Sequence, residues 1–193
     1  LAELGHSSDR LDLMADGRVL FVFHCNNEPG MCDDWDQDSG GNAAFILEPD
    51  ELCDGLTPVP DPEPPSYPEA RVARWLQRDD GLDAGLYSSF FREASYLSLG
   101  EEIISSVPMS TRLGGVPAWI QSADEAPQGE WRFIGQLDSR YSFFRPMPAL
   151  GGAPRALDAE PDPEQFEGRL WSTEGPNFGD GGIGYLFLRP SPG

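Results

Sequence analysis

The sequence contains no lysine, so all 13 of its basic residues are arginine, and these face 33 aspartate and glutamate residues. The resulting net charge of −20 makes the surface repulsive to phosphate groups and to anionic lipid. We therefore expect neither nucleic acid nor a membrane as a partner, and the charge favours a basic protein surface instead. The absence of lysine is typical of a GC-rich genome.

Long apolar runs and a secretion signal are also missing. No run approaches the roughly 20 residues that a membrane span requires, and no charged and apolar leader regions stand at the N-terminus. The cysteines number three, which fits a reducing compartment better than a disulfide framework. These absences predict a cytoplasmic protein. Because the chain begins at Leu1 and not at Met, we expect a longer N-terminal part to have been trimmed.

What the sequence does contain is an internal repeat. Residues 134–138 read Ile-Gly-Gln-Leu-Asp and are followed by the segment 180–187, which starts Asp-Gly-Gly and continues as an apolar run. The chain opens in the same way, with 1–5 followed by the segment 16–23, which starts Asp-Gly-Arg. A unit of strand, turn and strand that occurs twice predicts a duplicated β-rich domain. It also predicts that the first copy is truncated at its N-terminal side.

Several further strands are predicted from apolar and β-branched runs. The run from Arg18 to His24 shows no polar alternation, which predicts a central strand buried on both faces. A second short strand is predicted over Ala43–Leu47. In the C-terminal part we predict strands over Val116–Gln121, Trp131–Asp138, Tyr141–Phe144 and Ile183–Arg189.

One helix is predicted over 66–81. Ser66 and Glu69 have the spacing of a capping box, and an apolar stripe with helical period follows, made of Val72, Trp75 and Leu76. A weaker helical pattern covers 84–97, and 101–106 is compatible with a short helix or a strand.

The predicted fold class is α+β and mostly β: a duplicated unit of mixed or antiparallel sheet with one or two helices packed on it. The expected organisation is one domain over 1–193. It divides into a first half-repeat (1–49), a proline-rich acidic linker (50–65), a helical middle (66–109) and a second half-repeat (110–193).

The segment 111–121 reads Thr-Arg-Leu-Gly-Gly-Val-Pro-Ala-Trp-Ile-Gln. It precedes Phe-Ile-Gly-Gln-Leu-Asp-Ser at 133–139 and Phe-Gly-Asp-Gly-Gly-Ile-Gly-Tyr-Leu-Phe at 178–187. These three motifs in this order resemble the bacterial YwqG-like proteins, whose TYPP domain also occurs in programmed cell death protein 2 and in yeast Tsr4. The resemblance covers residues 110–190 well and 1–47 more loosely.

The resemblance implies a duplicated β-sheet fold. In the eukaryotic members it implies a dedicated chaperone role for a ribosomal protein, whereas no general activity follows for the bacterial ones. The residues of the motif also have a physical interpretation: two glycines permit unusual backbone angles, and Trp119 supplies a large apolar anchor. A structural role is one interpretation of Arg112 and Trp119; the other is that they line a binding groove.

The most acidic local segment is the loop 26–42. Asp34, Asp36 and Asp38 alternate as in a calcium loop, but the EF-hand pattern fails because Ser39 and Phe45 stand where glycine and glutamate are required. Three interpretations remain open: another kind of calcium site, a solvated loop rich in Asx turns, and a contact loop for a basic partner.

Zinc and cysteine chemistry are disfavoured. The candidate ligands are His24, Cys25, Cys32 and Cys53, but neighbours on a strand point to opposite faces, so the first two do not readily share one ion. The same geometry disfavours His24 and Cys25 as a nucleophile pair.

We therefore expect a non-catalytic protein-binding module that captures a basic protein, in a chaperone-like or immunity-like manner. The alternative is a calcium- or small-molecule-binding domain with its site at 26–42. The residues expected at a partner interface are Arg112, Trp119, Trp35, Asp33 and Asp34, and those expected at a metal site are Asp34, Asp36 and Asp38. No catalytic residue is predicted, and calcium is the one cofactor considered.

Overall fold

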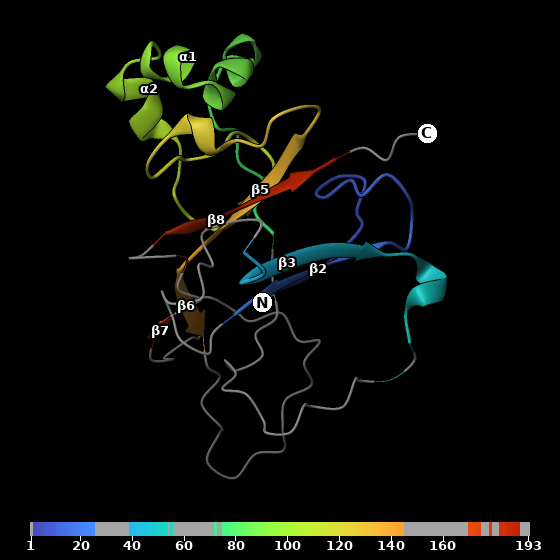
Figure 1. The fold of residues 1–193 in the computed structure, drawn as a ribbon. Coiled ribbons are helices and arrows are strands. Elements are labelled where there is room, and N and C mark those ends of the chain that lie inside the picture. The colour runs from blue at the N-terminus through green and yellow to red at the C-terminus, as the bar shows by residue number, and fades with distance from the viewer. Residues whose placement is uncertain are drawn as a thin grey trace.

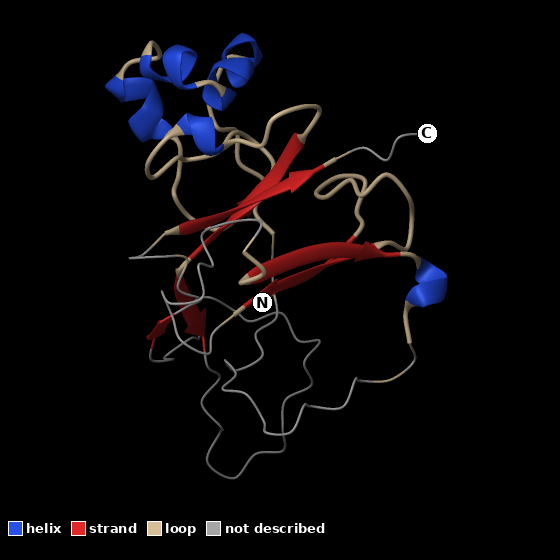
Figure 2. Cartoon of the chain, in the orientation of Figure 1, coloured by secondary structure: helices blue, strands red, loops and turns tan. Residues whose placement is uncertain are grey.

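A computed structural model describes the chain over 2–25, 39–53, 55, 72, 75–144, 170–174, 178 and 182–189. For 140–144 and 170–174 it describes the backbone alone. More of these residues lie in strands than in helices, and most of the short helices gather on one side of the strands (Figure 2). The fold is α+β and mostly β, as the sequence predicts.

The N-terminal sheet consists of β1 (Ala2–Gly5), β2 (Val19–His24) and β3 (Asn42–Leu47) in that order. All pairings are antiparallel, and one cross-strand row joins Glu3, Phe21 and Phe45. After β3 the chain makes the exposed 3-10 turn η1 (Pro49–Glu51). The strand predicted over 18–24 is thus confirmed as the central strand of this sheet.

The C-terminal sheet consists of β4 (Arg112–Leu113), β5 (Arg132–Asp138) and β8 (Ile183–Leu188), again antiparallel. Figure 1 shows β5 and β8 crossing above β2 and β3. A separate antiparallel pair is formed by β6 (Arg140–Phe144) and β7 (Leu170–Glu174). The predicted strands over 131–138, 141–144 and 183–189 are therefore confirmed, each within a residue of its expected start.

The two sheets contain the same two-stranded unit in the same register. In β1 and β2, Leu4 pairs with Leu20 and Glu3 pairs with Phe21. In β5 and β8, the residues that the sequence repeat aligns with these four pair in the same way: Leu137 with Gly184, and Gln136 with Tyr185. The third strand differs, since β3 lies beside β2 whereas β4 lies beside β5.

A shared apolar core joins the two sheets. Side chains alternate between the faces of a strand, so each unit turns one face toward the other unit. The buried members of this core are Leu11, Leu13, Leu20, Val22, Ile134, Leu137 and Leu186. At Gly184 a Cβ would lie 2.9 Å from the ring of Phe178, which packs against this core.

A helical layer covers the other face of the C-terminal sheet (Figures 1 and 2). It is made of η2 (Ala84–Phe91), α1 (Glu93–Leu97), α2 (Glu101–Ser106) and η3 (Ala123–Glu125). Its buried residues pack with Val116, Ala118 and Trp119, against Tyr185 and Phe187 of β8. The weak helical pattern over 84–97 is realised as a 3-10 helix followed by a short α-helix, and 101–106 is helical.

Two predicted elements are wrong where the structure describes them. Residues 75–83 are not helical, and Trp75 and Leu76 of the expected apolar stripe are 40% and 69% exposed. The residues 66–71, with the expected capping box, lie outside the described part of the chain. Residues 116–121 form no strand; their backbone is held by side chains instead, for example by Gln136 and Tyr185.

Gln136 is the polar centre of the C-terminal half. It is fully buried, its Oε1 accepts from the backbone N–H of Ala118 (3.0 Å), and its Nε2 donates to the carbonyls of Pro108 and Ser110 (3.2 Å each). One side chain therefore fixes the strand, the segment before β4 and the segment after it. A buried amide that satisfies several backbone groups is costly to remove.

We expect Gln136→Leu to reduce the free energy of unfolding by about 2–4 kcal/mol, because it leaves buried backbone groups without partners. Glu3→Leu is the matched control, since Glu3 occupies the equivalent position of the first repeat and is exposed; its change should stay within about 0.5 kcal/mol. Urea unfolding monitored by tryptophan fluorescence measures both. Equal effects of the two substitutions would contradict this account of Gln136.

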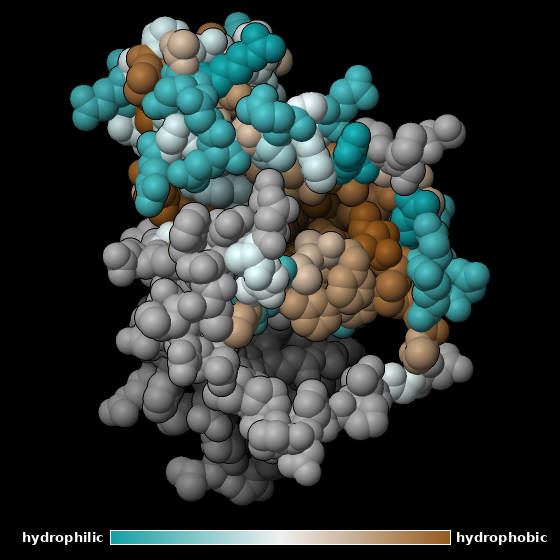
Figure 3. Space-filling model, viewed as in Figure 1, coloured by the Kyte–Doolittle hydropathy of each residue, from teal (hydrophilic) through white to brown (hydrophobic). Residues whose placement is uncertain are grey.

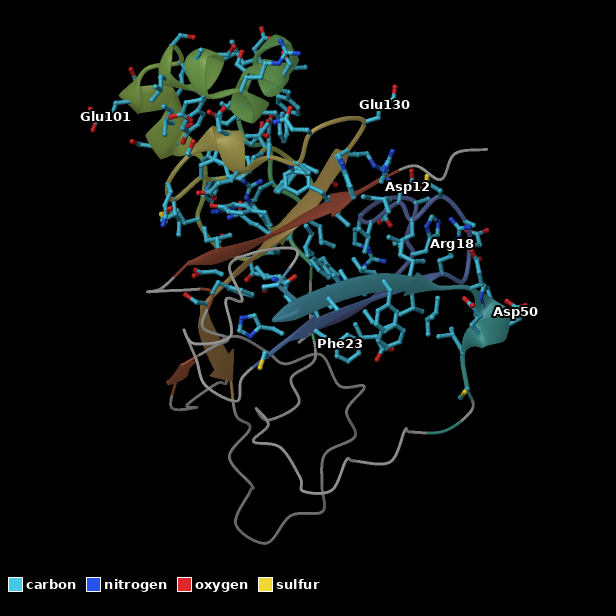
Figure 4. All side chains as sticks on the ribbon, viewed as in Figure 1. Asp12, Arg18, Phe23, Asp50, Glu101 and Glu130 are labelled. Carbon is cyan, nitrogen blue, oxygen red and sulfur yellow. The ribbon has the colours of Figure 1, made fainter. Side chains whose placement is uncertain are left out.

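An ion pair also links the halves, between Asp12 and Arg132 of β5 (Oδ2 to Nη1, 3.1 Å). Figure 4 shows Asp12 beside the end of β5. Its Oδ1 accepts from the N–H of Met14 (2.7 Å). That backbone hydrogen bond, followed by the guanidinium of Arg132, lowers the pKa of Asp12 below its ordinary 3.8.

A carboxyl group with a lowered folded-state pKa stabilises the fold above its unfolded-state pKa, and this contribution disappears as the pH falls through the folded-state value. We therefore expect Asp12→Asn to lower the melting temperature slightly at pH 7. The difference from the unchanged protein should shrink below pH 3.8. Thermal melts followed by circular dichroism over a pH series test this, with Asp50→Asn as the control. A difference that persists at low pH would contradict it.

Candidate interaction surface

The face of the N-terminal sheet that points away from the shared core carries three phenylalanines. We call it the outer face, and its described residues include Glu3, Phe21, Phe23 and Phe45. The three rings stack on one another, with centroid distances of 5.3 Å between Phe23 and Phe45 and 6.0 Å between Phe21 and Phe45. Figure 4 shows Phe23 on the side of β2 opposite to β5 and β8.

Two of these rings are exposed to solvent, and that of Phe21 is half-buried. Phe23 is 49% and Phe45 is 45% exposed, whereas Leu20 and Val22 of the same sheet are buried. The prediction that the strand over 18–24 is buried on both faces is therefore wrong. The apolar residues on one face of β2 enter the core. Those on its other face are not covered by the described residues. In Figure 3 tan and brown side chains accordingly gather on the surface over β2 and β3.

Acidic groups lie beside the rings and at one end of the sheet. Glu3 stands in the same cross-strand row as Phe21 and Phe45, and its side chain is exposed. At the other end of β3, Asp50 and Glu51 lie in the exposed turn η1. The surface thus combines a large apolar area with negative charge, and an exposed apolar patch with a polar rim is typical of a protein interaction site.

The equivalent face of the C-terminal sheet is covered. By the repeat, Phe21 corresponds to Tyr185 and Phe23 corresponds to Phe187. The ring of Trp119 lies 4.5 Å from that of Tyr185 and 6.3 Å from that of Phe187. The two halves therefore present aromatic residues at the same register positions, and the helical layer covers those of one half.

The structure places Trp119 inside this layer. Its side chain is 8% exposed, and its indole N–H donates to the carbonyl of Phe90 (2.6 Å). The hydroxyl of Tyr185 beneath it donates to the carbonyl of Ala118 (2.8 Å), and burial raises the pKa of that hydroxyl. Trp119 is thus an anchor of the fold.

Arg112 is engaged in the same region. Its guanidinium donates to the carbonyls of Pro108, Gly114 and Val116, and burial lowers its pKa, against the opposing effect of Asp80. Gly114 and Gly115 have φ of 72° and 73°, and a Cβ on Gly115 would lie 2.6 Å from Nη1 of Arg112. The positive φ angles and the close approach of Arg112 account for glycine at 114 and 115, and the hydrogen bonds give Arg112 a structural role. Contact with a partner stays a prediction for Arg112 and Trp119.

The other predicted site residues, Asp33, Asp34, Trp35, Asp36 and Asp38, lie outside the described residues, as does Cys32. Within the described part of the chain, no three side chains of His, Cys, Asp or Glu gather closely enough to hold a metal ion. Nor does any described helix have the length and apolar character needed to cross a membrane.

Two hollows lie beside Arg132. One has a volume of about 190 Å³ next to the loop 8–12, and the other has about 350 Å³ between Tyr87, Phe91 and Trp131. The guanidinium that borders both is already paired with Asp12. The outer face is therefore the better candidate site.

Sequence reasoning missed the residues of the outer face as a site. The available signal was the strand itself, because an antiparallel sheet with one solvated face normally alternates apolar and polar residues. The run Val-Leu-Phe-Val-Phe at 19–23 does not alternate. Such a run indicates either burial on both faces within the domain or an apolar face left for a partner.

Comparison of the chain with protein-family models, with curated proteins and with solved structures found no match. The resemblance to the YwqG-like proteins accordingly stays a prediction from the three sequence motifs.

If the outer face is not part of the core, repeat-equivalent substitutions should differ in their effect on stability. We expect Phe187→Ser to lower the free energy of unfolding by about 2–4 kcal/mol, since Phe187 packs on Trp119 and Phe133. Phe23→Ser should cost about 1 kcal/mol or less, the value of its ring stacking. Urea titrations measure both, and a loss for Phe23→Ser as large as that for Phe187→Ser would assign Phe23 to the core.

Proposed function

We propose that this protein is a non-catalytic protein-binding module that captures a basic partner on its outer face. The observation that carries the proposal is the stack of the half-buried Phe21 with the exposed Phe23 and Phe45, on a sheet whose other face is buried. Burying such rings against a partner would release the free energy that their exposure to water costs. The chaperone role that the resemblance implies for the eukaryotic members would be one form of such capture, and an immunity-like role would be another.

Charge supports a basic partner over a neutral one. The chain carries −20, Glu3 stands in the cross-strand row of Phe21 and Phe45, and Asp50 and Glu51 follow β3 in the exposed turn η1. Opposite charge accelerates encounter and penalises wrong partners. The rings themselves favour cations, because a guanidinium or ammonium group placed over an aromatic face is attracted by its π electrons. A partner segment with arginine or lysine between apolar residues would therefore fit both properties of the surface.

The alternative function, binding of calcium or a small molecule at 26–42, stays a prediction from the sequence, because only residues 39–42 of that loop are described.

The proposal is tested with a fluorescent peptide of alternating arginine and leucine, titrated with the protein and followed by anisotropy. We expect binding in about 10 mM salt and a marked loss in about 500 mM salt, because screening weakens contacts between exposed charges. The double substitution Phe23→Ser and Phe45→Ser should weaken binding about tenfold or more, as expected for aromatic residues at the centre of an interface.

Leu97→Ser is the matched control, since Leu97 is 66% exposed and belongs to α1, which is not part of the N-terminal sheet. It should bind like the unchanged protein, and a peptide of alternating glutamate and leucine should not bind. The proposal fails if the phenylalanine and leucine variants bind equally well. Sedimentation of the free protein adds a second readout: self-association lost in the phenylalanine variant would assign the surface to a second copy of this chain.

A further inference from the structure

We infer that the partner binds as an extended segment along the edge of β1, the outermost described strand of its sheet, and that it covers the outer face as the segment 112–119 covers the equivalent face of the C-terminal sheet. This inference rests on the proposed function. It adds the manner of binding and the chemistry of the bound segment: a strand with an arginine opposite Glu3, followed by an aromatic residue that packs on Phe21 and Phe23.

The two halves of the chain pair their repeated strands in the same way. The pairing of β1 with β2 and that of β5 with β8 have the same register at every aligned position from Gly5 to Ala2. In the C-terminal half, β4 occupies the far edge of β5, with Arg112 opposite Gln136. In the N-terminal half, β1 is the outermost described strand of its sheet. Glu3 is the residue that corresponds to Gln136.

Hydrogen-bond geometry shows which groups of β1 face that edge. The N–H of His6 donates to the carbonyl of Arg18, so by the alternation of an antiparallel ladder Leu4 bonds toward β2. The N–H and C=O groups of Glu3 and Gly5 then point to the opposite side. Their counterparts on β5 are used: the N–H of Asp138 donates to Oγ1 of Thr111, and Gln136 lies in register with Arg112. A strand edge with outward backbone groups is a template for an added strand.

Charge specifies the residue opposite Glu3. In the C-terminal half that position is held by Arg112, whose Nη2 lies 3.4 Å from Oε1 of Gln136. The N-terminal half has a carboxylate where the C-terminal half has an amide, so a guanidinium in the same place would form an ion pair. Opposite charges directly across two strands stabilise the pairing, and like charges oppose it. The bound strand should therefore carry arginine or lysine at this position.

The aromatic rings specify a second residue. Trp119 follows Arg112 by seven positions and packs on Tyr185 and Phe187. Phe21 and Phe23 stand at the same positions of the first repeat and are not covered by the described residues. An aromatic side chain several residues beyond the arginine would complete this stack. Aromatic pairs contribute about 0.5–1.5 kcal/mol beyond the area that they bury.

The edge of β1 differs from that of β5 in one residue, and the bound strand comes from another protein. A Cβ on Gly135 would lie 2.6 Å from the carbonyl oxygen of Arg112, and the corresponding residue of the first repeat is Ala2, which has that Cβ. A strand bound beside Glu3 must therefore lie farther from Ala2 than β4 lies from Gly135, so the inferred pairing keeps the register of β4 on β5 but not its close spacing. A second copy of this chain is also a poor donor of the strand, because its own segment 112–119 is held in its core by Trp119. The occupant is a different protein.

The test uses the chain's own segment as the probe: a labelled peptide with the sequence of residues 108–121, titrated with the full protein. We expect binding that falls about tenfold when the peptide amide of the arginine is N-methylated, since this removes one backbone hydrogen bond to Glu3. N-methylation of the next residue, the leucine, is the matched control, because its N–H points away from β1 and its loss should change little.

A charge exchange tests the arginine. Glu3→Arg should weaken binding about fivefold, and a peptide with glutamate in place of its arginine should restore binding to that variant alone. Replacement of the peptide's tryptophan by alanine should weaken binding to the unchanged protein, and should have little further effect on the Phe23→Ser variant.

The outcomes separate the two proposals. If the arginine–leucine peptide binds through Phe23 and Phe45 but the 108–121 peptide does not bind, the proposed function stands and this inference is wrong. The inference also fails if the two N-methylated peptides bind equally, or if Glu3→Arg is without effect. If neither peptide binds the unchanged protein, both proposals fail.

Discussion

The fold depends on one property of a β-strand: it has two faces, and successive side chains alternate between them. Both copies of the two-stranded unit carry apolar residues on both faces. They use one face each to form the shared core, where Leu20 and Val22 meet Leu137 and Leu186. Each copy then has one apolar face left. The helical layer covers that of the C-terminal copy, whereas in the N-terminal copy Phe23 stays exposed and Phe21 half-buried.

This asymmetry explains why the acidic composition and the exposed rings belong together. A sheet with an open edge and a flat apolar face is prone to pair with other copies of itself. A high net charge of one sign opposes such association, because like-charged molecules repel one another. In this chain Glu3 lies in the same row as two of the rings. Under the proposed function, the same negative charge would also attract a basic segment.

Sequence reasoning succeeds where the signal is a repeat or a strand of strong β propensity. The alignment of 1–5 with 134–138 predicts equivalent positions for Leu4 and Leu137, and the strand pairings confirm them. It fails where tertiary contacts override local preference. The extended chain over 116–121 satisfies its backbone through Gln136 and Tyr185 and forms no strand. The apolar stripe at 72–76 predicts a helix, although its described residues, 72 and 75–76, are not helical. The outer face escapes prediction because apolar residues on both faces of a strand are most simply attributed to burial.

The difference between Gln136 and Glu3 connects the fold to the proposed function. An amide can be buried when its donors and its acceptor all find partners, as they do at Gln136. A carboxylate in the equivalent place tolerates cover only if a cation arrives with it, because a buried unpaired charge is unfavourable. A neutral or acidic segment that covers Glu3 would leave its carboxylate buried and unpaired. A segment that brings an arginine would neutralise this charge. Under the proposed function, glutamate in place of glutamine at this one position would turn a buried position into part of a surface that discriminates between partners by charge, while the register around it is kept.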